Sequence, residues 1–363
     1  MQVPTVQNSI CETIVFGKGI GESIAVRLGL NEWMIIDSCL NDNKRPAALD
    51  YLKEKGVNPQ DEVKLIVISH FHDDHIKGIA EIINSCKNAK VVISAALNTS
   101  EFRGYINALS VNGEDMAKTK EINKVMSLFY DLHKNDRLVH AKKDCILFKS
   151  SENIQVHSLS PSDMDITNSD LEFANSTKLS SNFSEIAMSA KLVNPNHYCV
   201  VIRICSPTSE NNEVLLGADL EVSKNTGWNS VCNAINSPEQ NLAGIFKLPH
   251  HGSQTGFHEE TWNKLIKKDP ISILTTYDKS SLPRQDMIDL YKSKSSALYC
   301  TSMPKSDKAQ EKSPAIAEAR SILAKMKSSV SFSNNNNKFG IVVVSNCLTS
   351  SPKVETHYAA VCL

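Results

Sequence analysis

Short apolar runs alternate with polar turns through the first quarter of the chain and predict a succession of strands and helices. Two runs joined by a glycine-rich turn at 17–21 are typical of a β-hairpin, and a third strand follows at 33–36. Beyond them the pattern predicts a helix over 45–57, a strand over 64–69, a helix over 76–86 and a strand over 90–94. This rhythm indicates an α/β fold.

The pattern changes twice in the middle of the chain. Residues 97–140 carry helical periodicity and many lysines, which we interpret as a helical insertion beside the active site; a solvated helical face without function is the alternative. Residues 162–190 are rich in Ser, Asn and Asp and predict a long loop. A helix is predicted over 286–294, and strands are predicted within 145–150, 153–161, 197–204, 213–220, 243–249, 271–278 and 339–345. Because no internal repeat or clear linker is present, we predict a single domain over 1–363.

Composition narrows the function classes. The 363 residues include 41% hydrophobic ones, enough for a large core, and 39 basic against 40 acidic side chains leave a formal charge of −1. Any nucleic-acid binding must therefore depend on a local basic patch. The 10 cysteines stand singly, with no CxxC pair, which is typical of reduced thiols in the cytosol. With no signal peptide and no apolar run of bilayer length, we expect a cytoplasmic protein without a membrane partner.

The segment KLIVISHFHDDHIKG at 64–78 brings metal-ligating side chains together. His70 and His72 come where the predicted strand ends and, being two residues apart in extended backbone, point to the same side. Asp74 and His75 follow in the turn before the next helix. Imidazoles with a carboxylate suit zinc or another borderline divalent cation, and one cation cannot easily use all of these ligands. We therefore predict two adjacent cations, the first held by His70 and His72, the second by Asp74 and His75.

The HxHxDH pattern of these four residues resembles the signature of the metallo-β-lactamase superfamily. The resemblance implies an α/β sandwich of the αββα type, with two mixed sheets and outer helices. It also implies further ligands at later strand ends, and the matching positions are His197 for the first cation, one of His250 and His251 for the second, and Asp219 as a bridge between them. Which of the two adjacent histidines binds is left open. Asp37 is expected to support the metal-binding loop through hydrogen bonds.

Later segments narrow the resemblance. LLGADLE at 215–221 and LPHHGS at 248–253 resemble the C-terminal hydrolase domain of the competence protein ComEC and its stand-alone relatives, and so does the segment at 275–302. The sequence departs from that branch at Lys77, where a glycine is usual, and at NHYCVV over 196–201.

The metal centre predicts hydrolysis. Two neighbouring cations lower the pKa of a shared water, so that a bridging hydroxide can attack an electrophile at neutral pH. Asp74 would help to orient this hydroxide, and whichever of His250 and His251 is not a ligand would protonate the leaving oxygen. The leading interpretation is a metal-dependent phosphodiesterase or nuclease with two divalent cations, zinc first and manganese as the other candidate. A hydrolase of small esters, lactones or thioesters is the first alternative, and a metal-stabilised binding or regulatory subunit is the second.

Groups that suit a phosphate backbone support the leading interpretation. Ser253 and Thr255 offer hydroxyls beside the paired histidines, and Lys77 follows the first motif. Further lysines occur in the predicted insertion and near the last motif: Lys118, Lys120, Lys124, Lys264, Lys267 and Lys268. We expect a nucleic acid or a nucleotide as substrate, and a protein partner that supplies specificity is compatible with the sequence.

Overall fold

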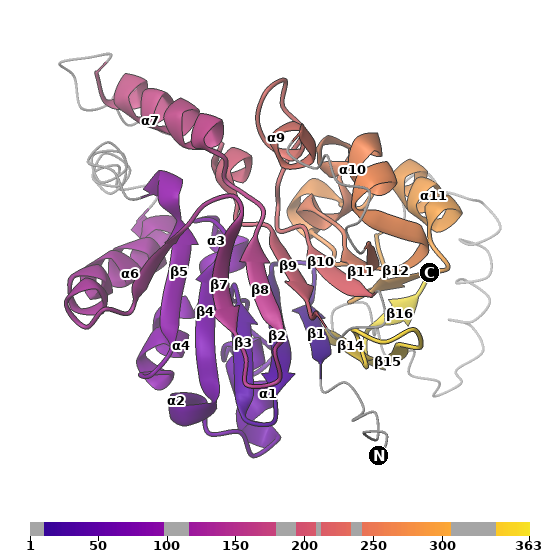
Figure 1. The fold of residues 1–363 in the computed structure, drawn as a ribbon, viewed down its shortest axis with the longest axis horizontal. Helices are drawn as coiled ribbons and strands as arrows, with labels where there is room; N and C mark the ends of the chain where they lie inside the picture. Colours follow the sequence, from indigo (N-terminus) through magenta and orange to yellow (C-terminus); the bar gives the residue numbers. More distant parts are fainter. Residues whose placement is uncertain (1–10, 98–115, 179–193, 208–211, 234–241, 306–338) are drawn as a thin grey trace, which may run out of the picture.

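Two eight-stranded sheets pack face to face in the computed structural model, with helices on their outer faces (Figure 1). The structure describes residues 11–97, 116–178, 194–207, 212–233, 242–305 and 339–363. In strand order the first sheet is β15-β14-β1-β2-β3-β4-β5-β6 and the second is β16-β13-β12-β11-β10-β9-β8-β7. Both sheets mix parallel and antiparallel pairs, which confirms the predicted α/β class and is consistent with the metallo-β-lactamase fold.

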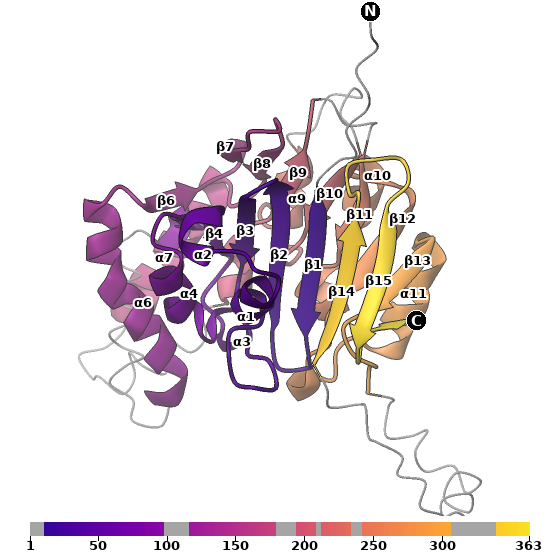
Figure 2. The same cartoon turned by 90° about the horizontal axis from the view of Figure 1, so that it is seen from below.

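The first sheet combines the N-terminal strands with two strands from the C-terminal end of the chain. Its strands are β1 (Glu12–Gly17), β2 (Glu22–Gly29), β3 (Glu32–Ile36), β4 (Val63–Ile68), β5 (Lys90–Ser94), β6 (Leu138–Ala141), β14 (Gly340–Ser345) and β15 (Lys353–Tyr358). Strands β3 to β6 are mutually parallel, and the remaining pairs are antiparallel. The helices on this side are α1 (Ala47–Glu54), α2 (Pro59–Glu62), α3 (Asp73–Ile76), α4 (Ile79–Ser85) and α6 (Met116–Lys134). Figure 2 shows β14 and β15 beside β1.

The second sheet is built from the later part of the chain. Its strands are β7 (Cys145–Lys149), β8 (Gln155–Ser158), β9 (Ile202–Cys205), β10 (Glu213–Leu216), β11 (Ala243–Lys247), β12 (Ile266–Leu274), β13 (Ala297–Cys300) and β16 (Val361–Cys362). Strands β10 to β13 are mutually parallel. Its helices are α9 (Trp228–Asn233), α10 (Glu259–Lys264) and α11 (Gln285–Lys294). The predicted hairpin of the HYCVVIRI and EVLLGADL runs is confirmed, since β9 and β10 pair antiparallel.

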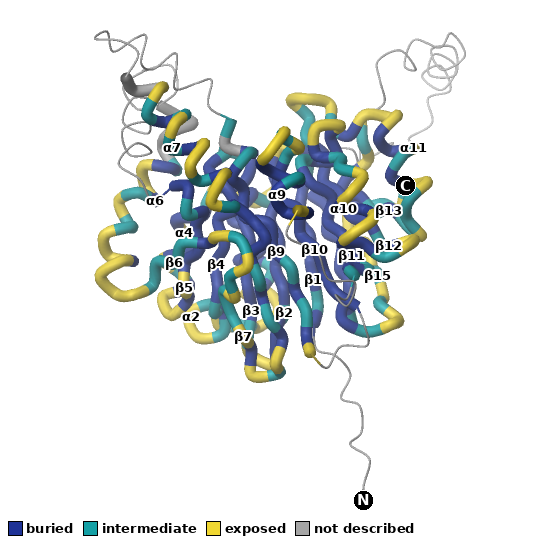
Figure 3. The backbone as a smooth tube through the Cα atoms, turned by 45° about the horizontal axis from the view of Figure 1, so that its top comes forward, coloured by how far each residue is buried: buried dark blue, intermediate teal, exposed yellow. Residues whose placement is uncertain are grey.

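Three apolar layers hold the sandwich together. They cover both faces of the central strands, and for this reason the sequences of these strands are continuous apolar runs. On β1, Val15 joins the layer between the sheets, whereas Ile14 and Phe16 join the layer under the outer helices. On β4, Val67 and Ile66 divide in the same way. A third layer lies between the second sheet and α9 to α11. Because both faces of each central strand are buried, the usual apolar and polar alternation is absent. Figure 3 shows buried strands and more exposed helices.

Part of the predicted insertion at 97–140 belongs to the sheet itself. Helix α6 packs against α4 and leads into β6, which pairs in parallel with β5. It is therefore the crossover that a parallel strand pair requires; residues 98–115 lie outside the described residues. Neither α6 nor any other described helix combines the length and apolarity that crossing a bilayer would take.

The predicted loop at 162–190 begins as a helix, α7 (Asp163–Lys178). Ser162 and Asp165 cap its first turn reciprocally, with the Ser162 backbone N–H donating to Asp165 Oδ2 over 2.7 Å and the Asp165 N–H donating to Ser162 Oγ over 3.2 Å. Phe173 is fully buried, and its ring lies 5.5 Å from that of Tyr198. The loop prediction was therefore wrong over 163–178, because a capping box and one buried aromatic outweigh many polar residues; residues 179–190 lie outside the described part of the chain.

Val125 tests whether α6 is integral to the fold. Its side chain is fully buried in the layer under the outer helices, so Val125→Ala removes two methyl groups from a packed site. We expect the free energy of unfolding to fall by about 2 kcal/mol, measured by urea denaturation. The neighbouring Lys124 is half exposed and pairs with Glu121 on the same helix, so Lys124→Ala should change stability by less than about 0.5 kcal/mol. Equal, small effects of both changes would contradict this assignment of α6.

Candidate metal centre

The first motif takes the shape that its spacing predicts. Strand β4 ends at Ile68, the backbone stays extended to His72, whose φ and ψ are −90° and 147°, and α3 then begins. His70 Nε2 lies 3.1 Å from His72 Nδ1, which brings both imidazoles to one point. His75 is fully buried and returns to the same place, with its ring centroid 4.3 Å from that of His70.

The second sheet supplies the opposite wall. Asp219 follows β10, and its two oxygens lie 3.3 Å from His75 Nε2 and 4.0 Å from His70 Nε2. His251 follows β11, and its Nε2 lies 3.2 Å from Asp74 Oδ2 and 3.7 Å from Asp219 Oδ2. Six of the predicted ligands therefore converge between the sheets: His70, His72, Asp74, His75, Asp219 and His251.

The atoms at this point fit metal cations. Ligand-type atoms within 4.8 Å of one another form three groups among the described residues: Glu22, His75, Asp219 and His251; Asp37, His70 and His75; and His70, His72 and Asp219. His75 Nε2 and Asp219 Oδ1 are buried and have no hydrogen-bond partner among the described residues. Such atoms are costly unless a ligand satisfies them. His70, His72 and Asp219 would hold one cation, and Asp74, His75, Asp219 and His251 a second.

Asp37 orients the imidazoles of His70 and His75. Its Oδ2 lies 2.8 Å from His75 Nδ1, and its two oxygens accept hydrogen bonds from the backbone N–H and the hydroxyl of Ser69. Ser69 Oγ in turn lies 3.0 Å from His70 Nδ1. The expected supporting role of Asp37 thus has a geometric basis, because hydrogen bonds to Nδ1 leave Nε2 facing the site.

The protonation states follow from burial and charge. Burial, aided by the neighbouring His75 and His72, lowers the pKa of His70 well below its ordinary value. Burial by itself would raise the pKa of Asp219, but His75 and His251 outweigh it and hold that pKa well below the usual range. Burial would also lower the pKa of His75, yet Asp219 and Asp37 raise it well above the ordinary value. A proton on His75 therefore takes the position that a bound cation would claim.

Three predicted ligands lie outside these groups: Asp74, which still lies 3.2 Å from His251, and the histidines His197 and His250. His197 belongs to none of the three, and its Nε2 lies 3.6 Å from Glu221 Oε2. His250 Nδ1 lies 2.8 Å from Glu221 Oε1, and its Nε2 lies 3.3 Å from Asn196 Nδ2. Of the two adjacent histidines, the structure thus brings His251 to the cluster and turns His250 toward Glu221. The predicted metal role of His197 finds no geometric basis among the described residues.

Glu221 is a site residue that the sequence reading missed. Besides the two imidazoles, it accepts hydrogen bonds from Asn194 Nδ2 at 3.0 Å and Thr255 Oγ1 at 3.0 Å. Burial would raise its pKa, but these hydrogen bonds, led by that from His197, lower it. The same bond raises the pKa of His197. The signal was its place in LLGADLE, two residues after Asp219, so that both carboxylates project from the same strand end. A second missed residue, Glu22, begins β2 and is buried beside His251.

Some of the residues predicted to bind substrate lie beside the metal centre, and others lie far from it. Ser253 Oγ and Thr255 Oγ1 lie 3.0 and 3.2 Å from His250 Nδ1, so both serve that imidazole. Lys77 is exposed and follows α3 directly. Lys264 pairs with Glu260 over 2.9 Å. Lys267 and Lys268 begin β12, about 20 Å from its carboxyl end at the site, so they do not border the metal centre. The side chains of Lys118 and Lys120 lie outside the described residues.

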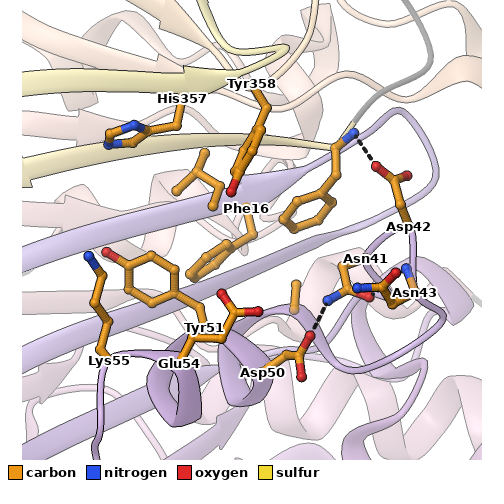
Figure 4. A pocket seen from close by; sticks show the side chains of 13 residues that line it. Phe16, Asn41, Asp42, Asn43, Asp50, Tyr51, Glu54, Lys55, His357 and Tyr358 are labelled. Atoms are coloured by element: carbon orange, nitrogen blue, oxygen red, sulfur yellow. Dashed lines mark hydrogen bonds between the residues drawn. The ribbon is translucent and has the colours of Figure 1, made fainter.

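A hollow of about 370 Å³ lies on the outer face of the first sheet and shares no residue with the metal centre (Figure 4). Phe16, Tyr51 and Tyr358 contribute aromatic rings to its lining, with Phe16 and Tyr51 5.3 Å apart between centroids. The carboxylates of Asp42 and Asp50 in this lining are already paired with Lys18 and Arg45.

Residues 17–148 match the family model described as Metallo-beta-lactamase superfamily. This stretch holds Asp37 and the HxHxDH motif, and the match agrees with the two-sheet fold. No curated protein matches the sequence. Together the match, the fold and the ligand groups support a metal-dependent hydrolase of this superfamily, with a dinuclear centre that the donor set can accommodate.

The solved structures that are similar to this chain have low sequence identity to it and low TM-scores. MEM-A1, a subclass B3 metallo-β-lactamase isolated from a soil metagenome library, is 12% identical with a TM-score of 0.36, covering 68% of this chain and 80% of its own. Rm3 metallo-β-lactamase is 14% identical with a TM-score of 0.36, covering 88% and 91%. AidC, a dizinc quorum-quenching lactonase, is 16% identical with a TM-score of 0.29, covering 55% and 55%. Overlap of this degree says nothing about the substrate.

The two adjacent histidines offer a matched test of the metal centre. His251→Ala removes an imidazole that faces Asp74 and Asp219, so protein reconstituted with zinc should retain about one cation instead of about two. His250→Ala removes an imidazole that faces Glu221, so its zinc content should equal that of the parent. Elemental analysis of desalted protein measures both. Loss of zinc from the His250 variant alone would reverse the assignment.

Proposed function

We propose that this chain is a dinuclear metal-dependent phosphodiesterase, acting on nucleic acid or nucleotides. One observation carries the proposal: His250 stands beside the ligand groups without belonging to them, and Glu221 Oε1 lies 2.8 Å from its Nδ1. An imidazole held in this way can give a proton to a leaving oxygen. The alkoxide that leaves an alkyl phosphodiester is strongly basic, as is the one that leaves an alkyl ester, so this donor supports hydrolysis and the groups around it decide between the two substrate classes.

The residues of the cluster would have separate roles in the hydrolysis. Two divalent cations, when bound at such a site, activate a water molecule and offset the charge that develops on the substrate oxygens. Asp74, whose Oδ2 is 3.2 Å from His251 Nε2, would orient the attacking water as well as hold a cation. Asp219 lies between the His70 and His75 imidazoles and would hold both cations in register. The packed sheets exclude bulk water from one side of this centre.

Donors around the centre suit an anionic substrate. The His197 side chain is 34% exposed, and its Nε2 lies 3.6 Å from Glu221 Oε2. Lys77 is exposed just after the first motif. Imidazole and ammonium groups in these positions would contact phosphate oxygens. A lactone or a neutral ester needs no such donors, which ranks that alternative second. The ComEC-like branch, suggested by LLGADLE and LPHHGS, fits the same substrate class.

Substrate class is tested by comparing metal-loaded protein on matched chromogenic compounds. We expect turnover of bis(p-nitrophenyl) phosphate, and of DNA or RNA, to exceed turnover of p-nitrophenyl acetate and an acyl lactone when zinc or manganese is present. The Asp219→Ala variant, which should lose metal, is the control for contaminating hydrolases. Rapid lactone or ester hydrolysis without phosphodiester cleavage would favour the alternative.

The role of His250 is tested by the leaving group. His250→Asn should lower kcat/KM for a phosphodiester with an alkyl leaving group by about 100-fold, because that alkoxide must be protonated as it departs. Cleavage of the p-nitrophenyl ester should fall much less, since p-nitrophenolate leaves without a proton. Equal losses on both substrates would assign His250 to binding instead of proton donation.

A further inference from the structure

Glu22 lies within a group of ligand-type atoms, yet its contacts are those of a supporting residue. Its side chain is 1% exposed, and both carboxylate oxygens accept hydrogen bonds from Lys247 Nζ. Oε2 accepts another from Thr275 Oγ1 over 2.6 Å. Lys247, at the end of β11, is itself 0% exposed. A carboxylate that already satisfies an ammonium and a hydroxyl has little capacity left for a cation.

Thr275 connects this buried pair to the metal centre. A threonine hydroxyl has one hydrogen, and Glu22, which can only accept, takes it. The contact of 2.8 Å between Thr275 Oγ1 and His251 Nδ1 must then be a hydrogen bond donated by His251. His251 therefore carries a proton on Nδ1, and Nε2 is the nitrogen that faces Asp74 and Asp219.

The first sheet contains the same arrangement. Ser69 Oγ donates to Asp37 Oδ2 over 2.6 Å and lies 3.0 Å from His70 Nδ1. By the same count of hydrogens, His70 carries a proton on Nδ1, and its Nε2 faces His72 and Asp219. One metal-site imidazole beside each sheet is thus held through a hydroxyl and a buried carboxylate, and for His251 that carboxylate, Glu22, comes from the first sheet. The resemblance between the two chains of hydrogen bonds supports a shared purpose.

We propose that Glu22, Thr275 and Lys247 form a buried positioning relay that fixes the tautomer of His251, and that Glu22 is not itself a metal ligand. Lys247 balances the Glu22 charge and holds the carboxylate against Thr275. Without the acceptor at Glu22, the Thr275 hydroxyl can donate to His251 Nδ1, and the imidazole proton moves to Nε2. That tautomer has no lone pair for a cation. The relay rests on the metal centre and is independent of the substrate class.

Neighbouring threonines provide a matched test of the relay. Thr275→Val removes the hydroxyl and keeps the shape, and Thr275→Ser restores a hydroxyl. Thr276→Val is the control, because Thr276 is equally buried but its hydroxyl contacts Ser302 Oγ. Zinc affinity is measured on the full chain by competition with a chromogenic chelator. We expect Thr275→Val to bind the second zinc about 10- to 100-fold more weakly, with the other two variants near the parent.

A second experiment separates the relay from direct coordination. Glu22→Gln is made together with Lys247→Met, so that no unpaired charge is buried. Long-range nitrogen–proton NMR on histidine-labelled protein should report Nδ1–H at His251 in the parent and a loss of that tautomer in Thr275→Val and in the double variant. If Thr275→Val keeps the parental second-site affinity and tautomer while the double variant loses zinc, Glu22 is a ligand and the proposal is overturned. Because zinc is the only probe, absence of phosphodiester cleavage would not affect this result.

Discussion

Four carboxylates lie buried at one edge of the sandwich, and each needs a positive charge or hydrogen bonds close by. The side chains that meet this need stand where the surrounding strands end. Glu22, Asp37, Asp74 and Asp219 are each at most 9% exposed. Buried carboxylates are strongly unfavourable unless hydrogen bonds and opposite charges offset their lost hydration. Lys247 satisfies Glu22, and the imidazoles of both sheets surround the rest. His75 Nε2 and Asp219 Oδ1 lie 3.3 Å apart without a hydrogen bond among the described residues, and cations between the sheets would satisfy both atoms.

Backbone strain gathers at the same edge. Asp37, Ala218, His250 and His251 all have left-handed backbones, with φ of 56°, 45°, 47° and 51°. Non-glycine residues adopt this region at a cost of about 1 kcal/mol or more each. All four lie in turns that come after strands leading into the metal centre. The turns that aim Asp219 and His251 are therefore held against their intrinsic preference by the packed sheets behind them.

The sequence predicted the parts of the site that depend on local spacing, and it failed where contacts cross between distant segments. His70 and His72 converge because two residues in extended backbone share a side, and this needs no tertiary information. His197 was expected among the ligands because it precedes a strand, and this role stays a prediction. In the structure its Nε2 faces Glu221, which follows the next strand along the chain. Likewise, the choice of His251 over His250 depends on successive left-handed residues, which residue types do not reveal.

The same distinction between local pattern and distant contacts applies to the fold. The β-strands from 12 to 94 were predictable because each is a compact apolar run, whereas α7 was missed because its apolar face consists of few residues, led by Phe173. The joining of β1 to β14 could not be predicted, since periodicity does not reveal which strands pair. In the sequence, Glu22 is an ordinary polar residue at the start of a strand. Its contacts with Lys247 and Thr275 in the structure are what identify it as a site residue.

The pairing of β1 with β14 governs how this chain can be made. A ribosome releases β1 long before β14, and until β14 emerges the nascent first sheet has an open edge at Glu12–Gly17. That edge is an apolar strand with free backbone donors and acceptors, the feature that recruits other nascent strands. A chain cut before residue 340 would keep this edge unpaired and exposed to the strands of other molecules.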